Sequence, residues 1–489
     1  MNMQAVSNLL GRLLALVGLS MLLPLFWALH YQGPDIRAFI LSIIITVGAG
    51  VLLCLWTKSG EIGHREGFAV AALGWVLAAA FGSLPFILAG SCSSFADAYF
   101  ETMSGFTTTG ATILTSIETE PRGILFWRSL TQWLGGMGIV VLFVAVFPKL
   151  GGGGYQLFRA EVPGLSADRL LPRITETAKA LWVLYLSLTL VLMVLLMLGG
   201  MDLYDALNHS FTTMATGGYS TRNASIRGFN SPYIEGVITV FILISATNFT
   251  LLYHVLRGNG KVLLQDAEFR FYGGMILVAT VLVTLSNRCG AYGNIISSLR
   301  YSAFQVVAIM TGTGFTSANY ELWPTLSKSI LLVLMFMGGC GGSTTGGMKQ
   351  IRILVCLKYA YRELYRLVHP RAVVPLRIGG RVVPEPTASG VMGFCVFYVA
   401  IFVIGTLTLT AFGLDIESSM GAVAATLGNV GPGLGRVGPA ENYGFLSGPV
   451  KLLLSLLMLF GRLEIFTVLL LFTREFHRVG YPDLLPRRS

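Results

Sequence analysis

Four short clusters of threonine and glycine interrupt an apolar chain, and none of them holds a charged residue. They read TTGAT at 108–112, TGGYS at 216–220, GTGFT at 312–316 and NVGPG at 429–433. We call them clusters 1 to 4. Each has a glycine at its centre, and these central glycines are Gly110, Gly218, Gly314 and Gly431.

The clusters can offer backbone carbonyl oxygens to a cation. Potassium-channel filters use four short loops whose carbonyls replace the water shell of the ion, and glycine permits the backbone conformations that this requires. Neutral oxygens suit a weakly hydrated monovalent ion better than Mg²⁺ or Ca²⁺, which favour carboxylates. We therefore predict a potassium filter, formed by Thr108, Thr109, Gly110, Thr216, Gly217, Gly218, Gly312, Thr313, Gly314, Asn429, Val430 and Gly431.

The alternative is that the clusters are ordinary glycine-rich turns between membrane helices. A single cluster would favour that interpretation. Four of them, each about a hundred residues from the next and each following a short helical stretch, favour the filter.

A second motif, MGGCGGSTTGGMK at 337–349, places six glycines inside an apolar stretch. We call residues 337–349 the polyglycine loop. Each glycine costs about 1 kcal/mol relative to alanine in a helix interior, so the motif predicts a break in the helix. Close packing of helices through small residues is the alternative. A phosphate-binding loop is excluded because Met348 separates Gly347 from Lys349.

Several polar residues lie inside apolar stretches. Arg462 and Glu464 stand in the last one, where a charge is costly and usually faces a partner or a watery path. They are two residues apart and point to different helix faces, which disfavours a local pair. We assign Arg128 and Gln132 to helix packing, and His209 to a hydrogen-bonded position in the core.

Composition defines the elements that must position these residues. The chain is 54% hydrophobic and only 12% charged, with a mean hydropathy of +0.70, whereas soluble proteins carry about 25% charged residues. Apolar stretches at 9–29, 180–198 and 452–472 are long enough to span a bilayer. The six cysteines show no metal-ligand spacing. We predict an all-α polytopic membrane protein.

The stretches around the clusters repeat. After two leading spans within 1–66, four units follow at 67–176, 177–265, 266–382 and 383–489. Each unit has a span, a short helix, a cluster, a polar loop and a second span. Asp97 and Asp205 stand at the same distance before their glycines and are good N-caps. Helices this short are tolerated at membrane depth only when buried or lining a cavity, which predicts a pseudo-fourfold ring.

The net charge of +10 is concentrated in particular loops. Lys149, Arg159, Arg169, Arg173 and Lys179 lie in one loop, eight basic residues lie within 349–381, and Arg474, Arg478, Arg487 and Arg488 lie near the end. The positive-inside rule places these segments, and both termini, in the cytoplasm. The charge is thus explained by membrane topology, with the bilayer as partner and no nucleic acid.

In combination the motifs resemble a known family. The clusters, together with WRSLTQWLGGMGIVVL at 127–142, FMGGCGGSTTGGMKQIRIL at 336–354 and LFGRLEIFTVLLLF at 459–472, are similar to TrkH-type subunits of bacterial potassium uptake systems, in the Trk/Ktr/HKT superfamily. The resemblance implies two leading helices and four M1–pore helix–M2 repeats around one pore. It also implies K⁺ as the transported ion without an organic cofactor, an inner-membrane homodimer, and a cytoplasmic TrkA-type (RCK) nucleotide-binding ring.

The resemblance further implies a gate below the filter. Its residues would be Arg462 and the polyglycine-loop residues Gly338, Gly339, Gly341, Gly342, Ser343, Thr344, Thr345, Gly346 and Gly347. Gly312 and Asn429 depart from the TVGYG pattern of tetrameric channels, which implies less strict selectivity. An ion-coupled symporter of the H⁺/K⁺ or Na⁺/K⁺ kind remains the alternative. An enzyme is not expected, because the six histidines form no group.

Overall fold

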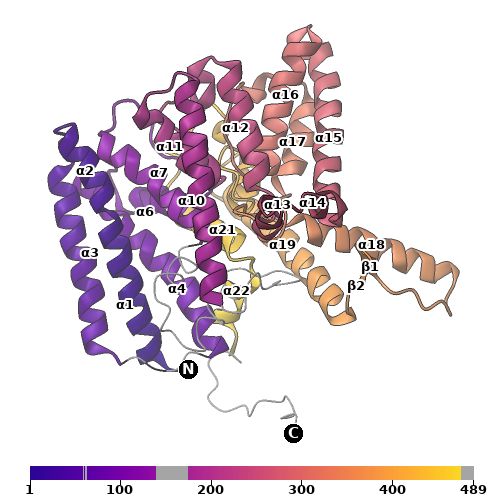
Figure 1. Ribbon diagram of the computed structural model, residues 1–489, viewed down its shortest axis with the longest axis horizontal. Helices are drawn as coiled ribbons and strands as arrows, with labels where there is room; N and C mark the ends of the chain where they lie inside the picture. The colour runs from indigo at the N-terminus through magenta and orange to yellow at the C-terminus, as the bar shows by residue number, and fades with distance from the viewer. Residues whose placement is uncertain (59, 61–62, 139–173, 475–489) are drawn as a thin grey trace.

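The computed structural model describes residues 1–58, 60, 63–138 and 174–474. Seven of the basic residues used above to predict topology lie outside this described part: Lys149, Arg159, Arg169, Arg173, Arg478, Arg487 and Arg488. Within it the chain is mostly helical (Figure 1), and the strands are limited to the two-residue pair β1 (Arg377–Ile378) and β2 (Arg381–Val382).

The leading segment forms α1 (Met3–Ser20), α2 (Leu22–His30) and α3 (Ile36–Trp56). These helices stand side by side at one edge of the molecule (Figure 1). Helices α1 and α3 cross closely at Gly11 and Gly50, where a Cβ on either glycine would lie within 3 Å of the other's carbonyl oxygen. Small residues allow such close contact between membrane helices.

The rest of the described chain contains four sets of helices, each with a short helix that ends at a cluster. Set one is α4 (His64–Gly82), α5 (Leu84–Leu88), α6 (Phe95–Phe106) and α7 (Arg122–Gly136); set two is α10 (Ile174–Leu198), α11 (Leu203–Met214), η1 (Ser225–Phe229), α12 (Pro232–Ser245), α13 (Phe249–Leu256) and α14 (Lys261–Gln265). Set three is α15 (Ala267–Asn287), η2 (Arg288–Tyr292), α16 (Ile295–Met310), η3 (Tyr320–Leu322), α17 (Thr325–Met335) and α18 (Gln350–Val368); set four is α19 (Glu385–Ala411), α20 (Ile416–Leu427), η4 (Gly435–Val437), α21 (Gly448–Arg462), α22 (Phe466–Leu469) and η5 (Leu470–Phe472).

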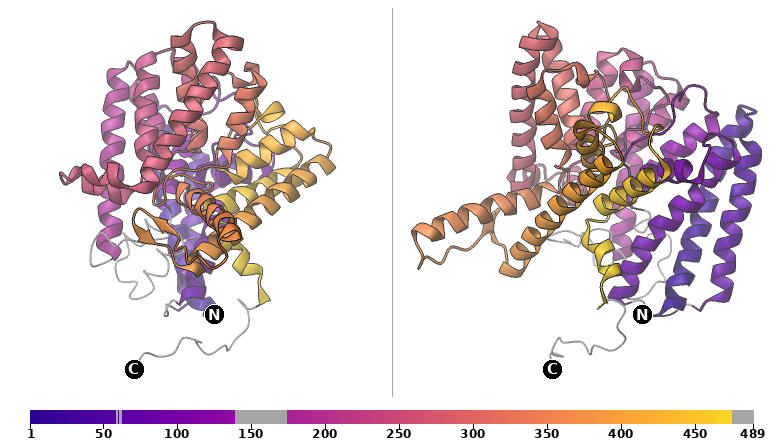
Figure 2. Two further views of the ribbon diagram at one scale, coloured as in Figure 1. Left: turned by 90° about the vertical axis from the view of Figure 1, so that its right-hand side faces the viewer. Right: turned by 180° about the vertical axis from the view of Figure 1, so that it is seen from behind.

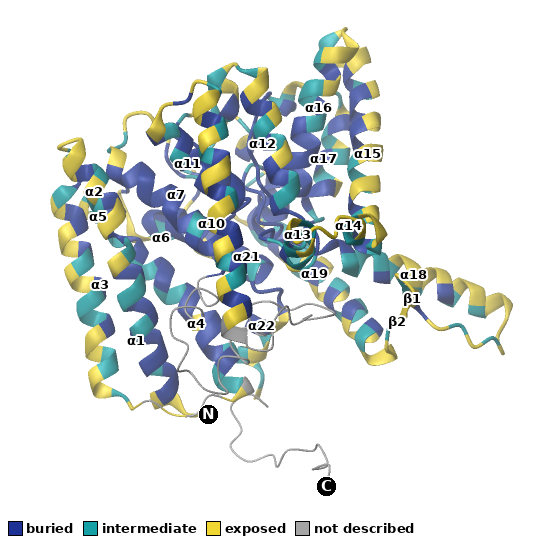
Figure 3. Ribbon diagram, in the orientation of Figure 1, coloured by how far each residue is buried: buried dark blue, intermediate teal, exposed yellow. Residues whose placement is uncertain are grey.

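Helices long and apolar enough to cross a membrane surround this core. In the described residues they are Met3–His30, Ile36–Trp56, Arg65–Leu88, Glu176–Leu198, Ala267–Tyr292 and Glu385–Ala411. Their outer faces expose leucine, isoleucine and valine, while α6, α7 and α11 are mostly buried (Figure 3). Exposed apolar side chains on spans of this length are expected to face lipid.

The prediction of a single membrane-spanning helix at 452–472 is wrong. The apolar stretch at 452–472 breaks after Arg462, and its two parts meet at an angle of 114°. Glu464 and Ile465 at the break have positive φ angles of 57° and 56°, which non-glycine residues rarely adopt. A comparable bend of 105° separates α12 from α13. The second helix of a set therefore need not run straight across the bilayer.

The short helices also begin earlier than the sequence suggested. Their N-caps are Ser94, Asp202, Asn294 and Asp415, whose side-chain oxygens accept hydrogen bonds from backbone N–H groups of the first turn. Asp97 and Asp205 lie three residues inside their helices. Asp97 instead forms a buried ion pair with Lys451 of α21 at 2.5 Å. The prediction of these aspartates as caps is wrong.

Helix α18 and the β1–β2 hairpin project from the helical body (Figures 1 and 2). Helix α18 immediately follows the polyglycine loop. It packs against the start of α19, where Arg362 forms two hydrogen bonds with Glu385 at 2.7 and 2.8 Å. Movement of α18 would therefore act directly on the polyglycine loop.

Candidate functional site

All four short helices end with the same hydrogen-bonded turn. The residue that follows the C-cap, which is Thr108, Thr216, Gly312 or Asn429, has a positive φ of 54°, 52°, 73° or 52°. The next N–H donates to the carbonyl five residues earlier, at 2.8, 2.8, 2.9 and 2.8 Å. This is the Schellman ending, in which glycine is usual at the left-handed position. Only cluster 3 has glycine there.

The central glycines repeat a second left-handed position two residues later. Gly110, Gly218, Gly314 and Gly431 have φ angles of 83°, 73°, 69° and 96°. Each cluster therefore has one left-handed residue directly after the C-cap and a second at the central glycine, two residues later. This repeated pattern gives the four clusters one shared backbone path despite their different side chains.

The four clusters close into a ring in chain order. A Cβ atom built on Gly110 would lie 2.1 Å from the carbonyl oxygen of Gly217 in cluster 2. On Gly218 it would lie 1.8 Å from that of Thr313, and on Gly314 1.9 Å from that of Val430. On Gly431 it would lie 2.6 Å from the oxygen of Thr109, which closes the circle. Any side chain at these positions would collide with the next backbone.

A cavity opens directly onto this ring. Its lining includes all four central glycines, together with charged residues Arg128, Arg222 and Glu441. Both arginines have acidic partners, since Arg128 pairs with Glu101 at 2.7 Å and Arg222 with Asp205 at 3.3 Å. The central glycines are therefore accessible from one side through a polar entrance.

Buried polar side chains hold the clusters from behind. Gln132 Nε2 donates to the carbonyl of Gly217 at 2.6 Å, while its Oε1 accepts from the N–H of Tyr219 at 3.1 Å. Arg128 stacks over the Tyr219 ring at 4.0 Å and is 1% exposed. The assignment of Arg128 and Gln132 to helix packing alone is wrong, because both contact the cluster backbone or its supports.

In three sets, the polar side chain nine positions before the central glycine is hydrogen-bonded to the segment that follows the glycine. Glu101 accepts from the N–H of Ile113 at 2.9 Å, and Gln305 accepts from that of Ser317 at 2.9 Å. His209 Nε2 lies 2.9 Å from Ser220 Oγ, with its Nδ1 2.8 Å from the Asp205 carbonyl. His209 is thus a hydrogen-bonded core histidine, as predicted. Set four has Ala422 there.

We expect Arg128→Met to destabilise the protein. The substitution leaves Glu101 buried without its cation, which costs about 3–5 kcal/mol when one partner of a buried pair is removed. The thermal unfolding temperature of the purified protein should fall. The double variant Glu101→Gln/Arg128→Met should recover most of that loss, and an equal loss in both variants would contradict the pairing.

The polyglycine loop lies against the clusters on the side away from the open cavity. Thr344 Oγ1 is 3.3 Å from Thr216 Oγ1 of cluster 2. A Cβ on Gly346 would meet the Asn429 side chain of cluster 4 at 2.4 Å. The loop touches the left-handed positions at which the short helices end.

Hydrogen bonds fix this position of the loop. Gly338 N–H donates to the Met348 carbonyl at 2.8 Å, and Cys340 N–H donates to that of Ala246 at 2.9 Å. One oxygen of Glu268, at the start of α15, accepts from the N–H groups of Gly341 and Ile351 at 2.7 and 2.9 Å. The loop is thereby tied to α15 and to the end of α12.

Arg462, at the end of α21 in set four, joins the polyglycine loop to set one. Its guanidinium donates to the Thr344 carbonyl at 2.5 Å and to the carbonyls of Gly135 and Gly136, at the end of α7, at 2.6 and 2.8 Å. It also lies 3.4 Å from Thr108 Oγ1. Glu464 pairs with Arg352 of α18. The expected separation of Arg462 from Glu464 therefore holds.

The structure brings the twelve predicted cluster residues into one ring, with the polyglycine loop and Arg462 beside it. The supporting residues Glu101, Gln132, Glu268 and Gln305 were not singled out for such roles from the sequence. For Glu101 and Gln305 the available signal was a polar residue nine positions before the central glycine, which set two shares through His209 and set four lacks.

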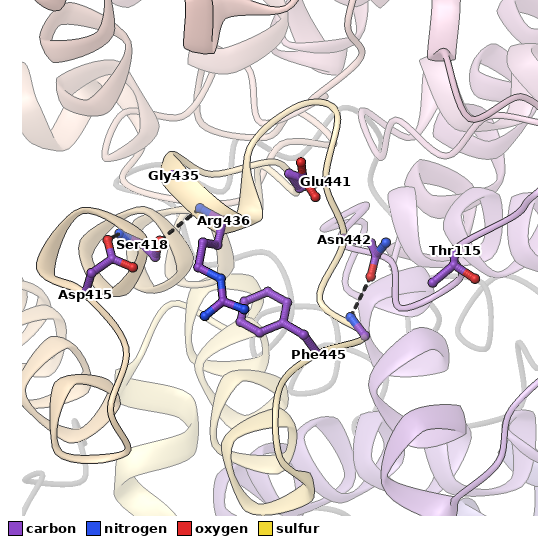
Figure 4. Close-up of a pocket in the computed structure, with 9 residues that line it drawn as sticks. Thr115, Asp415, Ser418, Gly435, Arg436, Glu441, Asn442 and Phe445 are labelled. Atoms are coloured by element: carbon purple, nitrogen blue, oxygen red, sulfur yellow. Dashed lines mark hydrogen bonds between the residues drawn. The ribbon is translucent and has the colours of Figure 1, made fainter.

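A second, larger cavity lies near the N-terminus of α20 (Figure 4). It is lined by Asp415, Ser418, Arg436, Glu441 and Phe445, among others. Arg436 stacks on Phe445 at 4.2 Å, and its backbone N–H donates to Ser418. The lining mixes both signs of charge. It shares Glu441 with the cavity over the ring but contains none of the central glycines.

These features define the class as an α-helical, multi-pass membrane protein with a buried ring of backbone turns. A family model described as the cation transport protein TrkH matches residues 35–478, and the chain belongs to this family. It is therefore a transport protein and not an enzyme.

Relatives match along nearly the whole length. The Trk system potassium uptake protein TrkH of Salmonella typhimurium is 43% identical over 98% of this chain and 100% of its own. The Escherichia coli K12 protein of the same name is 42% identical with the same coverage. The crystal structure of the potassium transporter TrkH from Vibrio parahaemolyticus superposes with a TM-score of 0.88 at 41% identity, covering 98% of this chain and 100% of that one.

Proposed function

We propose that this protein takes up potassium across the bacterial inner membrane through a gated pore, with clusters 1 to 4 as its selectivity filter. The closed ring of left-handed glycines, each facing a carbonyl of the next cluster, is the observation that carries this proposal. The names of the relatives support potassium as the transported ion.

The electrostatics of the ring favour a cation. The C-terminal ends of α6, α11, α16 and α20 all meet there, and each helix end carries a partial negative charge of roughly −0.5. The twelve cluster residues contain no ionisable side chain. Coordination by neutral oxygens favours a monovalent ion with weakly held water.

The polyglycine loop and Arg462 are proposed as the gate. The loop contacts clusters 2 and 4, while Arg462 contacts cluster 1. A fixed positive charge beside the ion path would repel a cation. Opening would then require both the loop and the guanidinium to move away from the ring.

Partners and orientation belong to the same proposal. The relatives are named as parts of Trk systems, which supports association with further components. We propose a homodimer and a cytoplasmic TrkA-type nucleotide-binding ring. The basic residues of α18, including Lys358, Arg362 and Arg366, support a cytoplasmic location for this helix by the positive-inside rule, with both termini on the same side.

Coupled transport is the second candidate. An H⁺/K⁺ or Na⁺/K⁺ symporter could use the same ring, and the broken helices of sets two and four are also typical of secondary transporters. The two candidates differ in whether uptake depends on a second ion gradient.

Uptake by the purified protein in liposomes tests the proposal. We expect ⁸⁶Rb⁺ to accumulate down its electrochemical gradient and an excess of K⁺ to compete more effectively than Na⁺. Equal competition by the two ions would contradict a potassium filter. Uptake that requires an imposed proton or sodium gradient would favour the symporter.

A further inference from the structure

Two thiols meet where the gate region joins the projecting helix. Cys356 of α18 and Cys395 of α19 place their Sγ atoms 3.0 Å apart. Both side chains are partly exposed. Met348, near the end of the polyglycine loop, has its Sδ 4.0 Å from the Cys395 sulfur. This cluster therefore connects the loop, α18 and α19.

The geometry is close to that of a disulfide. A sulfur–sulfur bond is about 2.05 Å long, so the two atoms need to approach by about 1 Å. Cys54, Cys92, Cys289 and Cys340 make no comparable sulfur–sulfur contact in the described part of the chain. Of the six cysteines, Cys356 and Cys395 are therefore the two whose sulfur atoms lie this close together in the described residues.

A positive charge lies beside the pair. Arg352, one helical turn before Cys356, is the ion-pair partner of Glu464 and stacks its guanidinium 4.0 Å from the ring centre of Phe394, the residue preceding Cys395. A nearby cation stabilises thiolate, which is the nucleophilic form of cysteine. Cys356 lies on α18, outside the candidate membrane spans, so its partial exposure gives a small oxidant access to the pair.

We propose that Cys356 and Cys395 are a redox-active thiol pair that hydrogen peroxide converts into a disulfide between α18 and α19. One thiolate attacks the peroxide oxygen, giving a sulfenic acid and, after protonation, water from the cleaved O–O bond. The second sulfur then attacks the first and displaces a second water. Overall, two thiols and one hydrogen peroxide give one disulfide and two waters.

The consequence for transport depends on the proposed function. Helix α18 starts at Gln350, immediately after the polyglycine loop, and Met348 is hydrogen-bonded to the loop at Gly338. A disulfide would hold α18 against α19 in the arrangement where Thr344 lies on cluster 2. Oxidation should therefore keep the gate closed, and reduction should release it.

Mass spectrometry tests the thiol pair without any transport measurement. The purified full-length protein is treated with hydrogen peroxide, alkylated with N-ethylmaleimide and digested. We expect a peptide linked through Cys356 and Cys395 that dithiothreitol separates, and none in Cys395→Ser. Recovery of both cysteines as alkylated thiols, or linkage of either one to Cys289, would overturn the proposal.

Rubidium uptake in liposomes then tests the effect on the gate. Peroxide should lower uptake by at least ~5-fold through a shift towards the closed state, dithiothreitol should restore it, and Cys356→Ser should not respond. A disulfide that forms without changing uptake would overturn the regulatory part. Absence of uptake in the fully reduced wild type would instead contradict the proposed function, and the peptide result would still decide the thiol pair.

Discussion

Gly218→Ser is expected to abolish most potassium uptake and the preference for potassium over sodium. A Cβ atom at this position would lie 1.8 Å from the Thr313 carbonyl oxygen, far inside contact distance. That atom is backbone, held in the ring by its neighbours, and cannot swing aside as a flexible side chain would. The left-handed φ of 73° adds about 1–3 kcal/mol of strain for serine.

The measurement is ⁸⁶Rb⁺ uptake in liposomes in competition with K⁺ and Na⁺. We expect at least a ~10-fold loss of uptake, equivalent to 1.4 kcal/mol or more, with the two competitors becoming equally effective. Gly200→Ser is the matched control, because Gly200 has a φ of 96° and no atom within 4 Å of its built Cβ. An equal loss of uptake in both variants would show that backbone strain, and not the contact within the ring, causes the loss.

Arg462→Ala is expected to raise uptake in the absence of any partner protein. The variant loses the hydrogen bonds to Thr344 and to the end of α7, together with the positive charge beside cluster 1. If the closed gate is the dominant state, removing this charge should increase basal uptake by about 10-fold or more. Deletion of residues 338–347 should act in the same direction.

Arg436→Ala provides the control for Arg462→Ala. Arg436 is exposed, stacks on Phe445 and lines the second cavity, near the N-terminus of α20, which contains no residue of the polyglycine loop. Its removal should leave basal uptake unchanged. A monodisperse Arg462→Ala protein with unchanged or reduced uptake would exclude Arg462 as part of the gate.

Much of the helical architecture was predictable from the sequence, because long apolar stretches and repeated glycines are local signals. The membrane spans at 9–29 and 180–198 fall within α1–α2 and α10. The break after Arg462 was not predictable, since leucine and phenylalanine continue on both sides of it. There the tertiary contacts of Arg462 and Glu464 override the local preference for a continuous helix.

The central glycines were predictable for the same reason, whereas the first left-handed position was not. Thr108 and Thr216 adopt a left-handed conformation that threonine rarely takes, so their residue type gave no indication of it. Asn429 adopts the same conformation, which asparagine tolerates better than threonine. The supports at Glu101 and Gln132 act on residues up to 87 positions away in the chain. Contacts of that kind depend on how the sets pack around one another.

The contact between clusters 4 and 1 that closes the ring, which we call the seam, has a consequence for biosynthesis. Three contacts of the ring join consecutive sets, but the fourth joins cluster 4 to cluster 1, where Asn429 Nδ2 also donates to Thr109 Oγ1 at 2.9 Å across 320 residues. Lys451 and Asp97 strengthen the same seam. Because chains emerge from the ribosome N-terminal end first, the first three sets can assemble as an open arc with an unpartnered edge. The ring can close only after the last set has been translated and inserted, so a premature stop after 400 residues would leave that edge exposed to quality control.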